Sequence, residues 1–238
     1  MSFLLVDAAN LFFRARHVIR HGTSEERVAM SYHIIFSSIL KQWREQKADH
    51  VVACFEGRSW RKQIYPLYKA QRADARAKLT PKEQEEEKIF WESFDVFQEY
   101  LTKRTNVTVL RNPGVEADDL IARWIDLHPN DKHVIVSSDK DFEQLVAPNV
   151  DLYNGITGIK TTINGYFDDK GRPVKDKKTK EVKPPPNPEF MLFEKCMRGD
   201  VSDNIFSAYP GVRTKGTKNK LGLQEAFADR DNKGFMWN

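Results

Sequence analysis

The chain has 238 residues, of which 40% are hydrophobic and 30% are charged, and its 38 basic and 34 acidic residues leave a formal net charge of +4. This length suits one large domain, or a domain with a small appendage, whose packed core lies under a very polar surface. The two cysteines, Cys54 and Cys196, have no paired spacing, which excludes a disulfide framework and a thiolate zinc site, and we expect both as buried thiols in a reducing compartment.

The N-terminal residues and the hydrophobic runs predict neither export nor a membrane span. Residues 1–7 lack the basic start and the long apolar stretch of a signal peptide. No apolar run reaches the length needed to cross a bilayer. We therefore expect a soluble, cytoplasmic protein with no membrane partner, and the small positive charge is only weak evidence for a nucleic-acid partner.

Short buried strands alternate with helices along the first part of the chain. Strands are predicted at residues 3–6, 51–55, 107–110 and 133–136. Helices are predicted from Thr23, from Thr80 and over residues 116–127, the first of them starting with a capping box. This alternation predicts an α/β fold with a mainly parallel central sheet flanked by helices. In such sheets, function collects beyond the carboxyl ends of the strands.

The second part of the chain is more irregular. Residues 150–153 and 158–162 are expected to pair as edge strands. Residues 168–187 hold several lysines and three consecutive prolines, which predicts a polar protruding loop. The sequence leaves open whether this loop is a solvated insertion or a DNA contact. Helices are expected again from Pro188 and over residues 219–228.

Acidic residues gather where these predicted elements begin or end. One group closes the first strand, one opens a helix, one closes the fourth strand, and one opens a loop after a helix: Asp7; Glu116, Asp118 and Asp119; Asp139 and Asp141; Asp200 and Asp203. Glu56 closes the second strand. Each group alone is explained as well by chance or by the helix dipole, but in a doubly wound sheet they can converge on one edge.

Such convergence predicts bound metal. Two carboxylates about 5 Å apart repel by roughly 3 kcal/mol at an effective dielectric constant near 20. Divalent ions with oxygen ligands relieve this repulsion, and Mg²⁺ suits carboxylates. Two ions carry too little charge to neutralise the whole set, so we expect some carboxylates to be protonated, outside direct contact with metal, or paired with Lys and Arg.

Residues 60–72 interleave basic and aromatic side chains. Cations for phosphates and rings for exposed bases suit a nucleic-acid surface, although an amphipathic surface helix has the same pattern. We expect Trp60 and Tyr65 to reach the core, and Lys69 and Arg72 to contact nucleic acid.

Taken together, these segments resemble the phage and bacterial 5′-3′ exonuclease and flap-endonuclease family, which includes the ribonuclease H of T-even-like phages. The match runs in order from residue 3 to about residue 215 and rests on residues 6–11, 60–72, 116–119, 138–142 and 199–204. The resemblance implies a PIN-like flap-endonuclease fold, with an α/β nuclease domain over residues 1–165 and a helical arch at about residues 70–90. A basic, proline-rich insertion at 166–187 and a C-terminal helical DNA-binding region at 188–238 would follow.

The same resemblance implies a metal-dependent 5′-nuclease that cuts flap or nicked duplex DNA and RNA–DNA hybrids, removing primers or flaps in replication. Two or more Mg²⁺ ions, for which Mn²⁺ substitutes, would be held by the acidic residues named above. Lys69 and Arg72 would stabilise charge on the scissile phosphate, and Arg14 and Tyr68 would contact substrate. We expect a monomer in the cytoplasm, that of the host cell if the gene belongs to a phage, with replication proteins as further partners.

Two departures from the family pattern keep alternatives open. Glu56 stands where the family usually has Asp, so Glu56 is either a metal ligand or a residue with another role. Residues 210–216 resemble a blurred start of the helix-turn-helix element that binds duplex DNA, in some relatives with K⁺, and Gly211, Arg213 and Lys215 are its expected contacts. This element is partial, and the chain ends at Asn238, earlier than in most relatives. The alternatives are a PIN-type ribonuclease and a catalytically weak nucleic-acid-binding relative.

Overall fold

The computed structural model describes residues 1–19, 21–208, 223–228 and 230. The chain divides into two compact units, described here separately. Unit 1 consists of Met1–Trp60 and Leu79–Pro186. Unit 2 consists of Arg61–Lys78 and Asn187–Asn238. The basic and aromatic segment that begins at Trp60 therefore lies almost entirely in unit 2.

Unit 1 is built on a mixed sheet with the strand order β3-β2-β1-β4-β5-β6-β7. The strands from β3 to β5 in this order pair in parallel, and β6 and β7 add antiparallel pairs at one side. The bounds are β1 Ser2–Asp7, β2 His50–Phe55, β3 Thr108–Arg111, β4 Lys132–Val136, β5 Val150–Asn154, β6 Ile159–Thr162 and β7 Gly165–Phe167. The predicted, mainly parallel sheet is confirmed, as is the pairing of residues 150–153 with 158–162. However, β5 also pairs with β4 and so lies inside the sheet.

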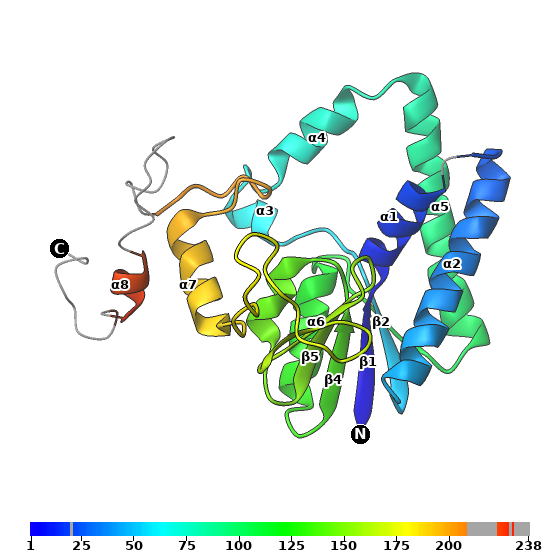
Figure 1. Cartoon of the computed structure of the whole chain (residues 1–238). Coiled ribbons are helices and arrows are strands. Elements are labelled where there is room, and N and C mark those ends of the chain that lie inside the picture. Colours follow the sequence, from blue (N-terminus) through cyan, green and yellow to red (C-terminus); the bar gives the residue numbers. More distant parts are fainter. Residues whose placement is uncertain (20, 209–222, 229, 231–238) are drawn as a thin grey trace. The chain divides into compact units, whose positions relative to one another are not determined.

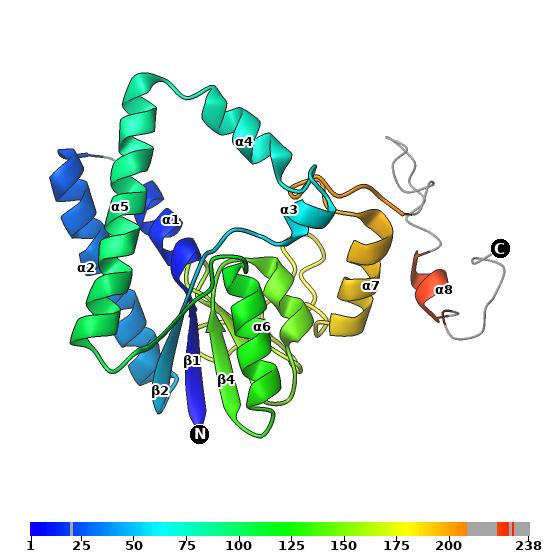
Figure 2. The ribbon, with the colours of Figure 1, turned by 180° about the vertical axis from the view of Figure 1, so that it is seen from behind.

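Helices cover both faces of this sheet, as Figures 1 and 2 show. One face carries α1 (Ala8–Val18), α2 (Ser24–Glu45) and α5 (Pro81–Arg104), and the other carries α6 (Ala117–Leu127) and the short 3-10 helix η1 (Lys140–Leu145). Because both faces are covered, four consecutive residues of β1, Phe3–Val6, are buried. The central strands therefore read as continuous apolar runs, which is what made them recognisable in the sequence.

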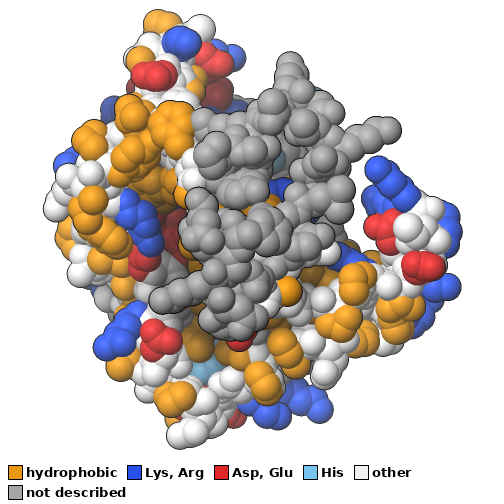
Figure 3. All heavy atoms as spheres, turned by 90° about the vertical axis from the view of Figure 1, so that its left-hand side faces the viewer, with side chains coloured by type: hydrophobic (Ala, Val, Ile, Leu, Met, Phe, Trp, Pro, Cys, Tyr) orange, Lys and Arg blue, Asp and Glu red, His pale blue; other side chains and the backbone are white. Residues whose placement is uncertain are grey.

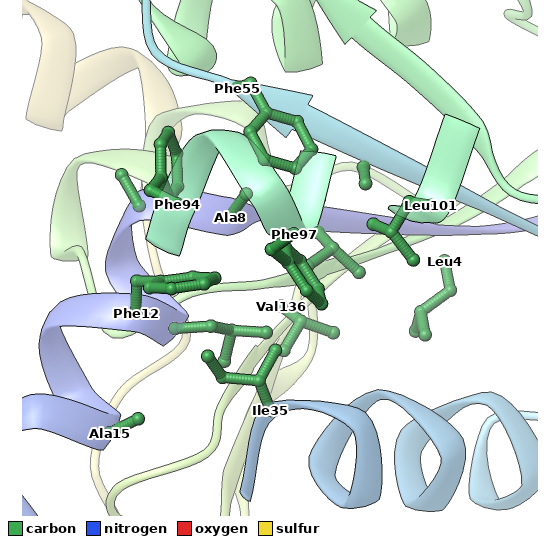
Figure 4. Close-up of a cluster of buried hydrophobic side chains, with 14 of the residues drawn as sticks. Leu4, Ala8, Phe12, Ala15, Ile35, Phe55, Phe94, Phe97, Leu101 and Val136 are labelled. Atoms are coloured by element: carbon green, nitrogen blue, oxygen red, sulfur yellow. The ribbon is translucent and has the colours of Figure 1, made fainter. Parts of the chain in front are cut away.

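The core between α1, α5 and the sheet contains a group of packed aromatic rings among aliphatic side chains (Figure 4). The ring of Phe94 lies 5.0 Å from that of Phe12, at 90°, and 4.9 Å from that of Phe55. Such edge-to-face and tilted pairs add to the free energy of burial. These contacts fix α1 and α5 over the carboxyl-terminal half of the central strands, where Asp7 and Glu56 follow.

Local sequence signals set the helix starts. Thr23 with Glu26, and Thr80 with Glu83, form complete capping boxes, and Pro81 occupies the first turn of α5, where a missing amide hydrogen costs nothing. The structure also contains α1 as a separate helix directly after Asp7, which the sequence analysis did not distinguish from the helix starting at Thr23.

Residues 167–183 are more ordered than a simple protruding loop. Phe167 forms an antiparallel bridge with Pro173, and Lys175 forms one with Val182. The chain therefore folds back twice beyond β7 before it reaches the prolines at 184–186.

Unit 2 contains short helices and a small aromatic contact. Its described helices are α3 Arg61–Ile64, α4 Ala70–Ala77, α7 Pro188–Arg198 and α8 Leu223–Ala228. Phe227 of α8 packs against Phe190 and Phe193 of α7, with ring centroids 5.3 and 5.4 Å apart. On the face drawn in Figure 3, apolar side chains lie between charged ones on the described surface.

Three expectations about exposure can be compared with the structure. Cys54 is buried as expected, but Cys196 is exposed, so the prediction of two buried thiols is wrong for Cys196. Trp60 is 44% exposed and does not reach the core.

Within the described part of the chain, none of the helices combines the length and apolar character that crossing a bilayer requires.

We predict that Phe94→Ala lowers the free energy of unfolding by about 3–5 kcal/mol, because it removes a fully buried ring and leaves a cavity. Urea denaturation measures this. The matched control is Val96→Ala on the same helix, where the side chain is 55% exposed and the change should stay within about 0.5 kcal/mol. Equal losses for the two variants would contradict the packing described for α5.

Candidate active site

Asp7 is fixed at the carboxyl edge of the unit 1 sheet by the elements on either side of it. It ends β1 and caps α1, where its Oδ1 accepts a hydrogen bond from Asn10 N at 3.1 Å. Its Oδ2 accepts one from Ser137 Oγ at 2.9 Å. Ser137 follows β4, the parallel neighbour of β1, so the register of these two strands brings the pair together. Asp7 is only 8% exposed.

The end of β4 carries the next carboxylates. Asp139 N donates to Ser137 Oγ at 3.1 Å. Asp139 Oδ1 accepts from Asp141 N at 2.9 Å, and this bond caps the N-terminus of η1. Asn10 Oδ1 accepts from both the amide and the hydroxyl of Ser138 at 3.0 Å. Asn10, Ser137 and Ser138 therefore hold the start of α1 to the end of β4. Their role has no signal of its own in the sequence, although Asn10 and Ser138 belong to the segments that carry the family resemblance.

Glu56 and Glu116 come from the neighbouring strand β2 and from the start of α6. A Cβ atom on Gly57 would lie 1.9 Å from the backbone oxygen of Asn112, so only glycine allows the chain to turn this close after Glu56. Glu56 Oε2 accepts a hydrogen bond from Ala117 N at 3.3 Å. This contact holds Glu56 against the N-terminus of α6.

The acidic residues of α6 divide between capping and exposure. Glu116 is 5% exposed and accepts a hydrogen bond from Ser59 Oγ at 3.2 Å. Glu116 also forms a capping box with Asp119, which accepts from Glu116 N at 3.3 Å. Asp118 is exposed. The cap explains why acidic residues occupy this turn even without a ligand.

The unit 1 carboxylates act on one another electrostatically. Burial, with contributions from the charges of Asp118 and Asp139, raises the pKa of Asp7 from 3.8 to about 6, although the hydrogen bonds from Asn10 and Ser137 oppose the rise. Burial and the charges of Asp7 and Asp118 raise the pKa of Glu56 from 4.5 to about 7. The structure therefore brings Asp7, Glu56, Asp118 and Asp139 into one region of negative potential.

The residues of this edge fit a hard divalent cation by their chemistry. The candidate ligands are carboxylates, and their oxygen atoms are the donors that Mg²⁺ and Mn²⁺ prefer. Across the described ranges, no group of three or more His, Cys, Asp or Glu side chains is already drawn together as a ligand set. The edge thus provides negative potential and oxygen donors without a closed protein cage, an arrangement suited to an ion that keeps several waters.

In unit 2, Asp203 is surrounded by the residues predicted to contact phosphate. Its Oδ1 accepts from Arg72 Nη2 at 3.1 Å, and its Oδ2 accepts from the Tyr68 hydroxyl at 3.2 Å. Lys69 Nζ lies 3.8 Å from the same Oδ2, and Lys69 N donates to the backbone oxygen of Asp203 at 2.9 Å. Tyr68 is only 5% exposed. Lys69, Arg72 and Asp203 thus form one charged cluster within unit 2.

This cluster depends on an unusual backbone. Lys69 has a φ of 53° and Asn204 a φ of 59°, a left-handed conformation that costs about 1–2 kcal/mol in residues other than glycine and less in asparagine. The Tyr65 hydroxyl donates to Asn204 O at 3.2 Å, and Asn204 Nδ2 donates to Leu67 O at 2.9 Å. These contacts join two segments that are distant in sequence. They also show that the Tyr65 side chain serves this junction.

Asp200 is paired separately. Its Oδ2 lies 2.7 Å from Lys195 Nζ, and Ser202 N donates to its Oδ1 at 2.7 Å. Partial burial opposes ionisation, but Lys195 and Ser202 outweigh it and hold the pKa of Asp200 down at about 2. Asp200 is therefore ionised at neutral pH.

Of the remaining predicted substrate contacts, Arg14 belongs to the described residues. Arg14 lies on α1, half-buried, with Nη1 only 2.2 Å from where a Cβ atom on Gly155 would be. Gly155, in the turn after β5, thereby makes room for the guanidinium. Gly211, Arg213 and Lys215, with the expected K⁺ element, lie outside the described residues.

Comparisons with known proteins agree on one family. Residues 2–177 match the family model described as 5′-3′ exonuclease, N-terminal resolvase-like domain. DNA polymerase I of Rhizobium leguminosarum is 30% identical over 183 residues, which cover 76% of this chain and 15% of the relative. Flap endonuclease Xni of Aeromonas hydrophila is 30% identical over 156 residues, covering 63% of this chain and 54% of the relative. The chain thus spans only part of the length of these relatives.

A solved structure shows the same fold. The flap endonuclease of bacteriophage T5, crystallised as a pseudo-enzyme-product complex with DNA and metal ions, matches with a TM-score of 0.66 at 22% identity. The match covers 97% of this chain and 75% of that chain. The resemblance thus extends across the described α/β architecture.

We predict that Asp7→Asn stabilises the metal-free protein at pH 8 by about 2–3 kcal/mol, because the charged carboxylate is disfavoured in the fold. The folded-state pKa values of Asp7 and Glu56 lie above those of the unfolded chain. Their contribution to stability is therefore fully present below about pH 4 and is lost as the pH rises through about 6–7. Melting temperatures in EDTA at pH 5 and pH 8 measure the effect.

The control for this experiment is Asp126→Asn, which neutralises an exposed carboxylate at the other end of α6. Its melting temperature should follow that of the wild type at both pH values. If Asp7→Asn were no more stable than wild type at pH 8, the electrostatic cost assigned to Asp7 would be wrong.

Proposed function

Because this chain belongs to the 5′-3′ exonuclease family through residues 2–177, we propose that it is a metal-dependent 5′-nuclease. It would hydrolyse phosphodiester bonds near the 5′ ends of flap or duplex DNA and of RNA–DNA hybrids. The observation that carries this proposal is the group of carboxylates at the carboxyl edge of the unit 1 sheet, with the pKa values of Asp7 and Glu56 raised to about 6 and about 7. Carboxylates with perturbed pKa values cluster at functional sites, and divalent cations relieve the repulsion among them.

We assign the metal ions to the acidic residues, with Mg²⁺ as the expected ion and Mn²⁺ as a substitute. When bound, two or more such ions would activate water and stabilise the charge that develops in an in-line displacement at phosphorus. We propose carboxylate ligands in each unit, taken by itself. In unit 1 they are Asp7, Glu56, Glu116, Asp118, Asp119, Asp139 and Asp141, and in unit 2 they are Asp200 and Asp203. The metal ions named with the T5 flap endonuclease complex support this assignment.

The observed pairing of these carboxylates addresses the excess of negative charge. Asp200 is paired with Lys195, and Asp203 with Arg72 and Lys69. In the capping box of α6, the side chains of Glu116 and Asp119 each accept a hydrogen bond from the other residue's backbone N–H. The charges of Asp200 and Asp203 are therefore partly compensated within unit 2, and the carboxylates of unit 1 depend more on bound cations.

We propose that Lys69 and Arg72 stabilise negative charge on the scissile phosphate. The αL backbone of Lys69 and its bond to Asp203 hold the ammonium in place before substrate arrives, and such preorganisation reduces the cost of reorganisation during reaction. Arg14 would bind a phosphate beside the unit 1 carboxylates. The Tyr68 hydroxyl donates its hydrogen bond to Asp203 Oδ2.

The physiological task that we propose is removal of primers or flaps in replication. The relatives named DNA polymerase I and flap endonuclease Xni support this role, and the T5 complex supports DNA as substrate. We propose that the protein acts as a monomer in the cytoplasm, in the company of replication proteins. The family match favours this role over a PIN-type ribonuclease.

We predict that an end-labelled 5′-flap duplex and an RNA-primed duplex are cleaved with Mg²⁺ or Mn²⁺ and left intact in EDTA. Lys69→Asn should lower the single-turnover cleavage rate by at least about 100-fold, because it removes charge next to the reacting phosphate. Asparagine is chosen because it tolerates the left-handed conformation of residue 69. Gel analysis of products gives the rate, and fluorescence anisotropy gives binding.

The matched control is Lys41→Ala, which removes an exposed lysine from α2 and should leave the rate unchanged. A wild-type protein that binds both substrates but cleaves neither with either ion would overturn the nuclease proposal and favour a binding protein. A Lys69→Asn variant as active as Lys41→Ala would refute only the role of Lys69.

We predict that Gly155→Ala weakens substrate binding about tenfold without unfolding the protein, since the new methyl group would displace the guanidinium of Arg14. Arg14→Ala should cause a similar loss, and the double variant should add nothing to either, as expected when two changes act through one contact. The KM for the flap duplex, measured for all four proteins, tests this cycle. Fully additive losses would show that Gly155 does not act through Arg14.

A further inference from the structure

The residues beyond β7 form an ordered element, here called the basic hairpin and defined as residues 168–183. Val174 N donates to Tyr166 O at 2.8 Å, and Lys183 N donates to Val174 O at 2.9 Å. Two antiparallel bridges accompany these bonds. The basic hairpin therefore continues the antiparallel side of the unit 1 sheet.

The tip of the basic hairpin is held by Asp176. Asp176 N donates to Glu181 O at 2.8 Å, and Lys180 N donates to Asp176 O at 3.0 Å. The carboxylate of Asp176 accepts from Lys178 N at 2.7 Å and Thr179 N at 3.0 Å. Because its acidic side chain is used to close the turn, the tip keeps a fixed backbone from which the lysine side chains project.

Exposed lysines dominate the surface of this element. Arg172 is paired with Asp168, but in the described part of the chain the lysines form no ion pair: Lys170, Lys175, Lys177, Lys178 and Lys180. Basic residues outnumber acidic ones in the basic hairpin, so its exposed surface favours an anionic partner.

The base of the basic hairpin is tied to the candidate active site. The Tyr166 hydroxyl donates to Glu143 Oε2 at 2.7 Å, and Lys183 Nζ lies 3.2 Å from the centre of the Tyr166 ring. Glu143 belongs to η1, the same short helix that carries Asp141 and is capped by Asp139. The contact of Lys183 with Tyr166 and that of Tyr166 with Glu143 thereby connect the basic hairpin to η1.

We propose that the basic hairpin binds the phosphodiester backbone of the duplex part of the substrate. This inference rests on the proposed function and adds a nucleic-acid contact outside the carboxylate edge. Residues 168–187 contain no aromatic side chain on which an unpaired base could stack. Lysines on a fixed backbone instead suit phosphates, which they neutralise without reading sequence.

The test is binding of a fluorescent duplex and of a single strand of the same length by the full chain in EDTA, so that no cleavage occurs. The hairpin variant replaces Lys177, Lys178 and Lys180 with Gln, which removes the charge and leaves a flexible polar side chain of nearly the same length. We expect duplex binding to weaken about tenfold, and the slope of log affinity against log salt to fall by about 1 for each lysine that contacts a phosphate. Binding of the single strand should change less than twofold.

The matched control replaces Lys41, Lys103 and Lys132 with Gln, the same charge change on α2, α5 and the start of β4. It should bind the duplex within twofold of wild type. Equal affinity and salt slope for the hairpin and control variants would overturn the proposal, as would a single-strand loss as large as the duplex loss. Both readouts are independent of cleavage, so this failure is separate from failure of the nuclease proposal.

Discussion

Carboxylates repel one another at the carboxyl edge of the unit 1 sheet, and the fold must bear the cost of this repulsion. Parallel strands end on the same side, so β1, β2 and β4 deliver Asp7, Glu56 and Asp139 to one place. The desolvated charge of Asp7 is unfavourable there, and the hydrogen bonds from Ser137 and Asn10 offset only part of its cost. The hydrophobic core beneath α1 and α5 supplies the stability that lets such an edge persist in the folded chain.

Much of this edge could be predicted from the sequence because its signals are local. Buried strands read as apolar runs, Thr23 and Thr80 mark helix starts by their own capping boxes, and the parallel topology then dictates where Asp7 and Asp139 lie. The failures concern exposure and distant pairing. Trp60 is aromatic and so was expected in the core, but burial depends on what other segments cover. The junction between Lys69 and Asp203 joins residues far apart in the chain, and a left-handed Lys69 has no local sequence signal.

The pairing of Asp203 with Lys69 and Arg72 has an energetic consequence under the proposed function. The same two cations would serve the phosphate, and the same carboxylate would serve a metal ion. A metal ion bound to Asp203 weakens the ion pairs of Asp203 with Lys69 and Arg72. These two cations then interact more strongly with phosphate. Binding of metal and phosphate would therefore be mutually favourable, since each ligand releases the partner of the other. Before either ligand arrives, the two ion pairs of Asp203 compensate part of the positive charge of Lys69 and Arg72.

Several departures from ordinary folding preferences in this chain lie at the residues assigned to function or beside them. Asp7 is a buried carboxylate, Gly57 turns where no side chain fits, and Lys69 and Asn204 adopt a left-handed backbone. Sequences that fold well satisfy local preferences except where function demands otherwise. At the surface, Asp176 satisfies the backbone of the tip of the basic hairpin, while exposed basic residues outnumber acidic ones in that element. The ordered backbone and exposed lysines of the basic hairpin therefore suit it to bind an anionic partner.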